Sequence, residues 1–351
     1  MRIIILGTGS MASHHATHFA DLDGVEVVAG VDTNPERLQS FCDGHNIKER
    51  FASVDTAIAW GEFDAVANVT PDAAHHPTTM ACLAAGKHVF CEKPLAVNHP
   101  DALEMAERAE REGLVGMVNL SYRNVAEIHA AREYVTSGQI GNVRHVEASY
   151  LQSWLVSKNW GDWRTEPRWL WRLSKEHGSN GVLGDVGIHI LDFVSFGTAS
   201  DISDVTCRLK TFHKADGDQI GDYRLDANDS CVMTAEFGNG ALGVIHATRF
   251  ATGHLNDLRL RIYGDKGAVE VKHGLQESEL HVCLGEDIDR AIWRKIEVQP
   301  VETNFQRFAR AVRSGQTEEP SFAHTAELQR ILDIGMASET GPSIEESRHV
   351  A

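Results

Sequence analysis

The feature that most constrains this chain is a run of six residues near its start, Gly7-Thr8-Gly9-Ser10-Met11-Ala12. It directly follows Ile3-Ile4-Ile5-Leu6, an apolar run long enough for one buried strand and too short for a helix. Glycines at this point permit a tight turn, and the helix that follows would present free N–H groups and its positive dipole end to a phosphate. The pattern therefore predicts a strand, a turn and a helix N-terminus that bind the pyrophosphate of a dinucleotide.

A second strand is predicted over 25–31, and it ends at Asp32, twenty residues past Ala12. An acid here accepts hydrogen bonds from an adenosine ribose and repels a 2′-phosphate, so Asp32, followed by Thr33, predicts NAD rather than NADP. Arg37, five residues past Asp32, is open to two interpretations. Its guanidinium either pairs with a 2′-phosphate and weakens that preference, or it lies on a solvated helix face.

Length and composition limit the class of protein. The 351 residues suggest two domains, and the net charge of −17 argues against nucleic acid or an anionic membrane as a partner. The sequence contains no run of eighteen apolar residues, so we predict no transmembrane helix. Met1-Arg2 leads directly into the first strand, so we expect no signal peptide. The six cysteines show no Cys-x-x-Cys spacing, which predicts free or buried thiols and a cytoplasmic location.

Residues 1–122 alternate short apolar runs with helical patterns. Strands are predicted at 3–6, 25–31, 65–69, 88–91 and 114–118, and helices at 11–20, 35–44, 73–85 and 99–112. This alternation predicts an α/β domain with a doubly wound parallel sheet, the Rossmann arrangement. The carboxyl ends of the strands in such a sheet line the ligand crevice.

Residues 123–351 read as a second domain, of α+β type, built on a mostly antiparallel sheet. A helix at 125–138 and a strand at 143–151 come first, and later strands are predicted at 203–212, 230–237, 241–250, 257–264 and 267–272. Glycine-rich hairpin turns are expected at 238–240 and 264–267, and helices at 303–314 and 324–338.

Glu92-Lys93-Pro94 follows the predicted strand at 88–91. A lysine at the carboxyl end of a strand, before a rigid proline, points into the crevice where a nicotinamide would lie, and can do acid–base work there. The alternative is a surface lysine in a turn. The local sequence leaves both interpretations open.

Asp185 and His189 are four residues apart, so a helix would put both on one face. A carboxylate beside an imidazole fixes its tautomer, and the pair suits removal of an alcohol proton while hydride leaves the same carbon. Two other interpretations stay open. Asp185 caps the helix while His189 is buried, or both bind a metal, although no third ligand is evident nearby.

Five of the seven tryptophans fall between residues 154 and 171, namely Trp154, Trp160, Trp163, Trp169 and Trp171. Arg164, Arg168 and Arg172 are interleaved with them. Aromatic faces pack on the C–H faces of sugar rings and arginines bind hydroxyls or carboxylates, so this segment predicts a sugar-binding region. The alternative is a tryptophan-rich structural loop or a subunit contact.

Three histidines follow the glycine turn, and His14 with His18 has the i, i+4 spacing of a metal-binding pair. No cysteine or carboxylate completes the set. We therefore interpret His14, His15 and His18 as structural or solvent-facing, and predict no metal site.

Taken together, these motifs resemble the Gfo/Idh/MocA oxidoreductase family over essentially the whole chain. The resemblance rests on Gly7-x-Gly9-x-x-Ala12, Asp32, Thr70-Pro71 followed by His75, Ala85-Gly86-Lys87-His88-Val89, Glu92-Lys93-Pro94-Leu95-Ala96, Gly138-Gln139-Ile140-Gly141 and Asp185-x-Gly187-x-His189-x-x-Asp192. The chain departs from the family at Ser179-Asn180-Gly181, where three glycines are usual. We expect this departure to alter a loop near the substrate while leaving the fold and class intact.

The resemblance implies that Lys93, Asp185 and His189 form the catalytic group. It implies a Rossmann domain joined to an α+β domain whose sheet often mediates dimers or tetramers. The resemblance also implies that several residues lie near the cofactor, namely Thr70, Pro71, His75, Glu92 and the pair Trp171-Arg172. Beside the substrate we expect Asp185 and His189, with further candidates in Tyr122, Arg123, Trp154, Trp163 and Arg164.

The function predicted from the sequence is NAD-dependent transfer of a hydride from a secondary hydroxyl of a sugar, glycoside or cyclitol. A homodimer or homotetramer is expected. Two other functions stay open. An NAD-dependent glycosidase shares the cofactor and the base but shows no net redox change, and a redox-silent sugar sensor shares the fold. Retention of Lys93, Asp185 and His189 counts against the sensor, which needs no proton relay.

Overall fold

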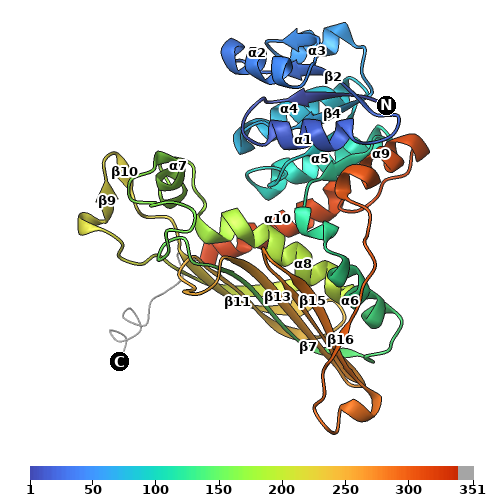
Figure 1. Cartoon of the computed structure of the whole chain (residues 1–351), viewed down its shortest axis with the longest axis vertical. Coiled ribbons are helices and arrows are strands. Elements are labelled where there is room, and N and C mark those ends of the chain that lie inside the picture. Colours follow the sequence, from blue (N-terminus) through green and yellow to red (C-terminus); the bar gives the residue numbers. More distant parts are fainter. Residues whose placement is uncertain (339–351) are drawn as a thin grey trace. The chain divides into compact units, whose positions relative to one another are not determined.

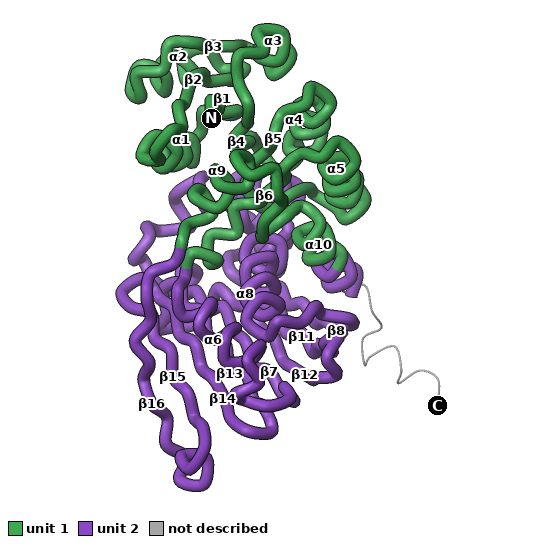
Figure 2. Tube along the Cα trace, turned by 90° about the vertical axis from the view of Figure 1, so that its right-hand side faces the viewer, with its two compact units in different colours: residues 1–124, 302–330 green, residues 125–301, 331–351 purple. Residues whose placement is uncertain are grey.

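The computed structural model describes residues 1–338, and the chain divides into two compact units (Figure 2). Unit 1 consists of residues 1–124 and 302–330, and unit 2 of residues 125–301 and, among the described residues, 331–338. The sequence prediction placed one boundary after residue 122. In the structure the chain returns to unit 1 because Phe305 and Phe308 pack in its core with Phe19 and Phe90.

Unit 1 contains a six-stranded sheet in the order β3-β2-β1-β4-β5-β6, and every neighbouring pair is parallel. This order confirms the predicted doubly wound sheet, with its switch point between β1 and β4. The strands are β1 (Arg2–Leu6), β2 (Glu26–Val31), β3 (Glu49–Phe51), β4 (Ala65–Asn68), β5 (His88–Cys91) and β6 (Gly116–Val118).

Helices cover both faces of this sheet, with α1 and α9 on one side and α4 and α5 on the other (Figure 2). Ile3 and Ile5 point into the core beneath α1 and α9, and Ile4 alternates to the opposite face. The helices of unit 1 are α1 (Ala12–Ala20), α2 (Pro35–Gly44), α3 (Val54–Trp60), α4 (Asp72–Ala84), α5 (His99–Arg111), the 3-10 helix η1 (Ser121–Asn124) and α9 (Asn304–Ser314). Helix α10 (Phe322–Ala337) continues into unit 2.

Unit 2 is built on an eight-stranded sheet in the order β16-β15-β14-β13-β7-β12-β11-β8 (Figure 1). Only β7 and β12 pair in parallel among its described strands, so the predicted mostly antiparallel sheet is confirmed. The strands are β7 (Val143–Gln152), β8 (Ile202–Lys210), β11 (Ser230–Phe237), β12 (Leu242–Thr248), β13 (Asn256–Gly264), β14 (Gly267–His273), β15 (Ser278–Leu284) and β16 (Arg294–Ile296).

One face of the large sheet is covered by α6 (Ala126–Thr136) and α8 (Ile188–Thr198) (Figure 2). Along β11 buried and exposed residues alternate, as expected for a strand with one covered face. The remaining short elements are α7 (Pro167–Leu170), η2 (Trp171–Leu173), η3 (Leu183–Gly187), η4 (Asp216–Asp218), η5 (Gly285–Asp287), β9 (Gln219–Ile220) and β10 (Tyr223–Arg224).

All six cysteines are buried free thiols. None of the helices described between residues 1 and 338 combines the length and apolar character that a membrane crossing requires.

Candidate active site

The glycine turn of unit 1 lies at the switch point of the sheet. Gly7 has a φ of +90°, and a Cβ placed on it would lie 2.7 Å from the carbonyl oxygen of Val69, in the loop after β4. Only glycine fits there. Beside Gly9, in contrast, a Cβ would meet no described atom within 4 Å, so the turn leaves open space next to the start of α1.

The first turn of α1 carries no acidic residue, and in the described chain no side chain caps its N-terminus. Its backbone N–H groups and the positive end of its dipole are therefore suited to an anion. Together with the space beside Gly9, this arrangement fits the pyrophosphate of a dinucleotide. Ser10 and Met11 are exposed at this turn.

Asp32 is locked in position at the end of β2. Its carboxylate accepts hydrogen bonds from the backbone N–H and hydroxyl of Thr8 at 2.8 Å each, and from the N–H of Asn34 at 2.8 Å. Arg37 donates to both oxygens, from Nε at 3.0 Å and from Nη2 at 2.8 Å. Burial alone would raise the pKa of Asp32, but these hydrogen bonds from Arg37, Asn34 and Thr8 hold it well below its usual range.

Arg37 thus does not lie on an unpaired helix face, because Asp32 holds it in bidentate geometry. Its side chain is 52% exposed, so the opposite edge of the guanidinium stays open to solvent. Thr33, between Asp32 and Asn34, is exposed.

Glu92, directly after β5, is held by groups from two other elements. His15 of α1, which is fully buried, donates from Nε2 to Oε1 of Glu92 at 2.6 Å, and Asn119 donates to the same oxygen at 2.8 Å. The backbone N–H of Lys93 donates to Oε2 at 3.2 Å. The structural interpretation of His15 is therefore confirmed, and Glu92 fixes the backbone from which the partly buried Lys93 side chain extends.

Unfolding of the protein should become easier in acid partly because of Glu92. Burial by itself raises the pKa of Glu92, but hydrogen bonds from His15 and Asn119 and the His15 charge lower it from 4.5 to about 2. A depressed carboxyl pKa contributes stability that is present above the unfolded value of 4.5 and is lost as pH falls toward 2. The contribution is on the order of 3 kcal/mol.

Urea unfolding of wild type and Glu92→Gln, from neutral pH down to about pH 3, checks this linkage. The difference in unfolding free energy should shrink as pH falls. Glu107→Gln, at an exposed position of α5, is the matched control and should show no such pH dependence. A constant difference between wild type and Glu92→Gln across the whole range would contradict the assignment.

The loops after β4 and β5 are joined by His75, which is fully buried. Its Nδ1 lies 2.7 Å from the carbonyl oxygen of Pro94, and its Nε2 lies 2.9 Å from that of Thr70. Thr70 also donates from its hydroxyl to Asn68 at 2.7 Å. Thr70, His75 and Pro71, which precedes α4, are therefore gathered at the carboxyl edge of the sheet.

Tyr122 and Arg123 lie in η1. Arg123 is buried, its Nη2 lies 2.9 Å from Nε2 of His324, and its carbonyl oxygen accepts from both terminal nitrogens of Arg307 at 3.1 Å. Tyr122 is partly exposed beside it. The structure thus gives Arg123 a clear packing role within unit 1.

In unit 2, Asp185 and His189 are joined by a π-helical turn. The predicted regular helix begins only at Ile188, because residues 183–187 form η3, whose hydrogen bonds each span one residue more than in an α-helix. Single π-turns of this kind occur often at functional sites. His189 is buried in α8, whereas the Asp185 side chain is 30% exposed and accepts from Nη2 of Arg249 at 3.1 Å.

The segment that departs from the family pattern is held by Asn228. Gly181 has a φ of +69°, and a Cβ on it would lie 2.4 Å from the Asn228 side chain. The carbonyl oxygen of Asn228 accepts from the N–H of Val182 at 2.8 Å, and its side-chain oxygen accepts from the N–H of Leu183 at 3.1 Å. Asn228 also donates to the carbonyl oxygen of Asn180 at 3.2 Å. The turn that bears Asp185 is thereby fixed at its start.

The tryptophan segment is largely packed on itself. Trp154 and Trp163 are 3% and 2% exposed and belong to a buried cluster with Leu155, Leu170, Leu173 and Leu225. This burial fits the structural interpretation of these two rings. Arg164 lies over Trp163, whereas Arg172 lies over Trp171, whose ring is partly exposed. Trp171 and Arg172 therefore offer the more accessible surface of the segment.

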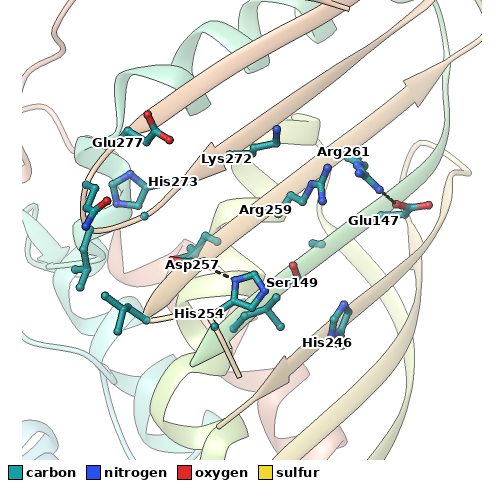
Figure 3. Close-up of a pocket in the computed structure, with 18 of the residues that line it drawn as sticks. Glu147, Ser149, His246, His254, Asp257, Arg259, Arg261, Lys272, His273 and Glu277 are labelled. Atoms are coloured by element: carbon teal, nitrogen blue, oxygen red, sulfur yellow. Dashed lines mark hydrogen bonds and ion pairs between the residues drawn. The ribbon is translucent and has the colours of Figure 1, made fainter. Parts of the chain in front are cut away.

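An open pocket of about 670 Å³ lies on the face of the large sheet, over β7, β12, β13 and β14 (Figure 3). Several of its polar side chains pair with one another, since Arg261 donates to Glu147 at 3.0 Å and Nδ1 of His254 lies 2.6 Å from Oδ2 of Asp257. No predicted catalytic residue lines it. Among residues 1–338, no group of three or more His, Cys, Asp or Glu side chains is arranged to hold a metal ion.

A parallel sheet in the 3-2-1-4-5-6 order, a tight glycine turn against β4 and a fixed acid at the end of β2 define the class: a protein with a dinucleotide-binding Rossmann fold. Residues 1–120 match the model of the oxidoreductase family with an NAD-binding Rossmann fold, and residues 128–270 match the GFO/IDH/MocA C-terminal domain. The chain belongs to the Gfo/Idh/MocA family, which confirms the resemblance seen in the sequence.

Several relatives are sugar dehydrogenases. Levoglucosan dehydrogenase of Pseudarthrobacter phenanthrenivorans is 29% identical over 246 residues, which cover 66% of this chain and 61% of that protein. D-glucoside 3-dehydrogenase of Escherichia coli is 27% identical over 250 residues, covering 69% of this chain and 68% of that protein. The chain thus spans about three fifths of the levoglucosan enzyme and 57% of glucose-6-phosphate 3-dehydrogenase of Bacillus subtilis.

Solved structures match over nearly the full length. An oxidoreductase domain protein from Kribbella flavida is 30% identical, with 96% of each chain covered and a TM-score of 0.81. Levoglucosan dehydrogenase in complex with NADH and L-sorbose has the same fold, with a TM-score of 0.83 over 97% of this chain and 96% of that one, at 24% identity.

Proposed function

We propose that the protein is an NAD-dependent dehydrogenase that transfers a hydride between a secondary hydroxyl of a sugar, glycoside or cyclitol and the nicotinamide. The observation that carries the proposal is the Asp185–His189 segment, held by Arg249 and Asn228, in a chain that also has the glycine turn and the fixed Asp32. The named activities of relatives, on levoglucosan, glucosides and inositol, support a polyol substrate.

NAD, when bound, supplies the acceptor for the hydride. The turn at Gly7–Ala12 and the start of α1 would hold its pyrophosphate, and Asp32 would accept from its adenosine ribose. His189 takes the proton of the substrate hydroxyl at an imidazole nitrogen, and Asp185 orients the ring and stabilises its protonated form. Lys93 stabilises the developing alkoxide with its ammonium charge. Tyr122, Arg123, Trp171 and Arg172 are proposed to flank the bound molecules.

The main test is a screen of sugars, glycosides and cyclitols with NAD, in which the release of NADH is followed by its absorbance. A preparation of Lys93→Met serves as the control for contaminating dehydrogenases. Cleavage of a glycoside without accumulation of NADH would instead indicate the glycosidase. Binding of a sugar without turnover of any substrate would indicate the sensor, and either result would contradict the proposal.

Cofactor preference should follow Asp32. In wild type we expect the higher kcat/KM with NAD, and Asp32→Ser should narrow the gap to NADP by about 10- to 100-fold, the range for a hydrogen bond to a charged group. The loss of Asp32 also releases Arg37 to meet a 2′-phosphate. Steady-state kinetics with NAD and with NADP, on Asp32→Ser and on the double variant Asp32→Ser/Arg37→Met, separates the loss of the carboxylate from the release of Arg37. A wild type that strongly prefers NADP would contradict the role of Asp32.

We propose further that the protein forms a homodimer or homotetramer in the cytoplasm. Support for self-association comes from exposed apolar side chains on the outer face of the large sheet, with Val232 51% and Leu242 53% exposed. Light scattering after size exclusion measures the mass, and a monomer at micromolar concentration would contradict self-association.

Cell fractionation tests the proposed cytoplasmic location, which the six free thiols support.

A further inference from the structure

Arg249, directly after β12, is an arginine whose side chain is completely buried. Its Nη1 donates to the carbonyl oxygen of Arg172 at 3.0 Å, and its Nη2 donates to the carbonyl oxygen of Gly181 at 3.1 Å and to Oδ2 of Asp185 at 3.1 Å. The guanidinium thus joins the end of the tryptophan segment, the start of the segment that bears Asp185, and the Asp185 carboxylate itself.

Arg249 is also held by Trp154 and by the backbone of Asp229. The guanidinium carbon lies 4.9 Å from the ring centroid of Trp154, and the backbone N–H of Arg249 donates to the carbonyl oxygen of Asp229 at 3.0 Å. A cation over an indole face gains electrostatic stabilisation that grows when water is excluded. Trp154 therefore limits where the guanidinium can move.

A second buried ion pair lies next to Arg249. Lys214 donates from Nζ to Oδ2 of Asp229 at 2.6 Å, and both side chains are almost completely inaccessible to water. Asp229 attracts Arg249 as well, so four charges alternate in sign along Lys214, Asp229, Arg249 and Asp185. Only the last of these, Asp185, reaches solvent to an appreciable extent.

Stability alone gives a weak reason for such a network. Buried ion pairs often contribute little compared with apolar side chains of similar volume, because each charge must leave water. Within the described residues, Nε of Arg249 and Oδ1 of Asp229 also lack hydrogen-bond partners, which adds to that cost. What the network does provide is a fixed position for the one carboxylate at its end.

We propose that Arg249 is a positioning residue for the reaction, which holds the Asp185 carboxylate charged and oriented so that it can act on His189. This proposal rests on the proposed dehydrogenase function. The Asp185 and Asp229 carboxylates offset the positive charges of Arg249 and Lys214, so the network links Asp185 to Asp229 and Lys214. No sequence motif of the family resemblance includes these three residues.

Kinetics of Arg249→Met, Arg249→Lys and Asp185→Asn, alone and combined, test the proposal. Arg249→Met should lower kcat by about 10- to 100-fold, the range for a charge-assisted hydrogen bond, with little change in the KM for NAD. Arg249→Lys, which keeps the charge, should recover most of the loss. In the Asp185→Asn background, Arg249→Met should cause almost no further loss of kcat.

Fluorescence titration with NADH and the thermal midpoint show whether each variant is folded, and Arg208→Met, at an exposed position of β8, is the surface control. A folded Arg249→Met with kcat within twofold of wild type would overturn the proposal, and so would losses that multiply fully in the double variant. If Arg249→Met does not fold, Asp229→Asn decides in the same assay, because it removes the buried carboxylate beside Arg249, and an unchanged kcat in a folded Asp229→Asn overturns the proposal. An Asp185→Asn variant with unchanged kcat instead overturns the proposed function of that segment.

Discussion

Replacement of Lys93 by methionine should cut turnover by about 10²- to 10⁴-fold, the range for a positioned acid–base group, while NAD binding weakens far less. Methionine keeps most of the apolar stem of lysine, so the partly buried side chain can still pack. The backbone at Lys93 is fixed by Glu92, which His15 and Asn119 hold in turn. The variant therefore removes the ammonium group from a segment that is otherwise unchanged.

Steady-state kinetics at saturating NAD, together with an NADH binding titration, separates chemistry from cofactor binding. Lys48→Met, which removes an exposed lysine just before β3, is the matched control and should keep kcat within about twofold. A Lys93→Met variant with nearly normal kcat would remove Lys93 from the catalytic group. A loss confined to the KM for NAD would assign it to cofactor binding.

The parts of the fold that could be predicted are those encoded by neighbouring residues. The buried run Ile3–Leu6, the glycine turn and the apolar run before Asp32 predict a strand, a helix start and a second strand in sequence order, and the structure has β1, α1 and β2 at these positions. In contrast, β3 and β16 have three residues each, and two of the three are charged, so the hydrophobic pattern carries no signal for them.

The partners that hold the candidate site could not be predicted, because they are distant along the chain. His15 and Glu92 are 77 residues apart, and Asp185 and Arg249 are 64 apart. No local pattern relates such pairs, and a buried arginine looks like any surface arginine in the sequence. Adjacent Asn228 and Asp229, between a polar loop and β11, were missed for the same reason. The π-helical turn at Asp185 was missed because helical spacing alone predicts the regular form.

His189 and Asp185 should behave as one coupled unit. His189→Ala should lower turnover by about 10²- to 10⁴-fold because it removes the base. Asp185→Asn should be milder, since the imidazole remains and loses only the charge that orients it. It should also move the limb of the pH–rate profile that reports the imidazole to lower pH, because the imidazolium loses a neighbouring negative charge.

The double variant decides whether Asp185 acts through His189. Where one group acts only through another, the losses do not add, so His189→Ala with Asp185→Asn should match His189→Ala alone. Adding Arg249→Met to His189→Ala should likewise lower kcat little further, because Arg249 acts only through Asp185, and Asp185 acts through His189. Measurement of all these variants at saturating NAD gives the answer. Strictly additive losses would mean that Asp185 has a separate task, such as binding a substrate hydroxyl directly. Arg249 would then position Asp185 for contact with the substrate and not for its action on His189.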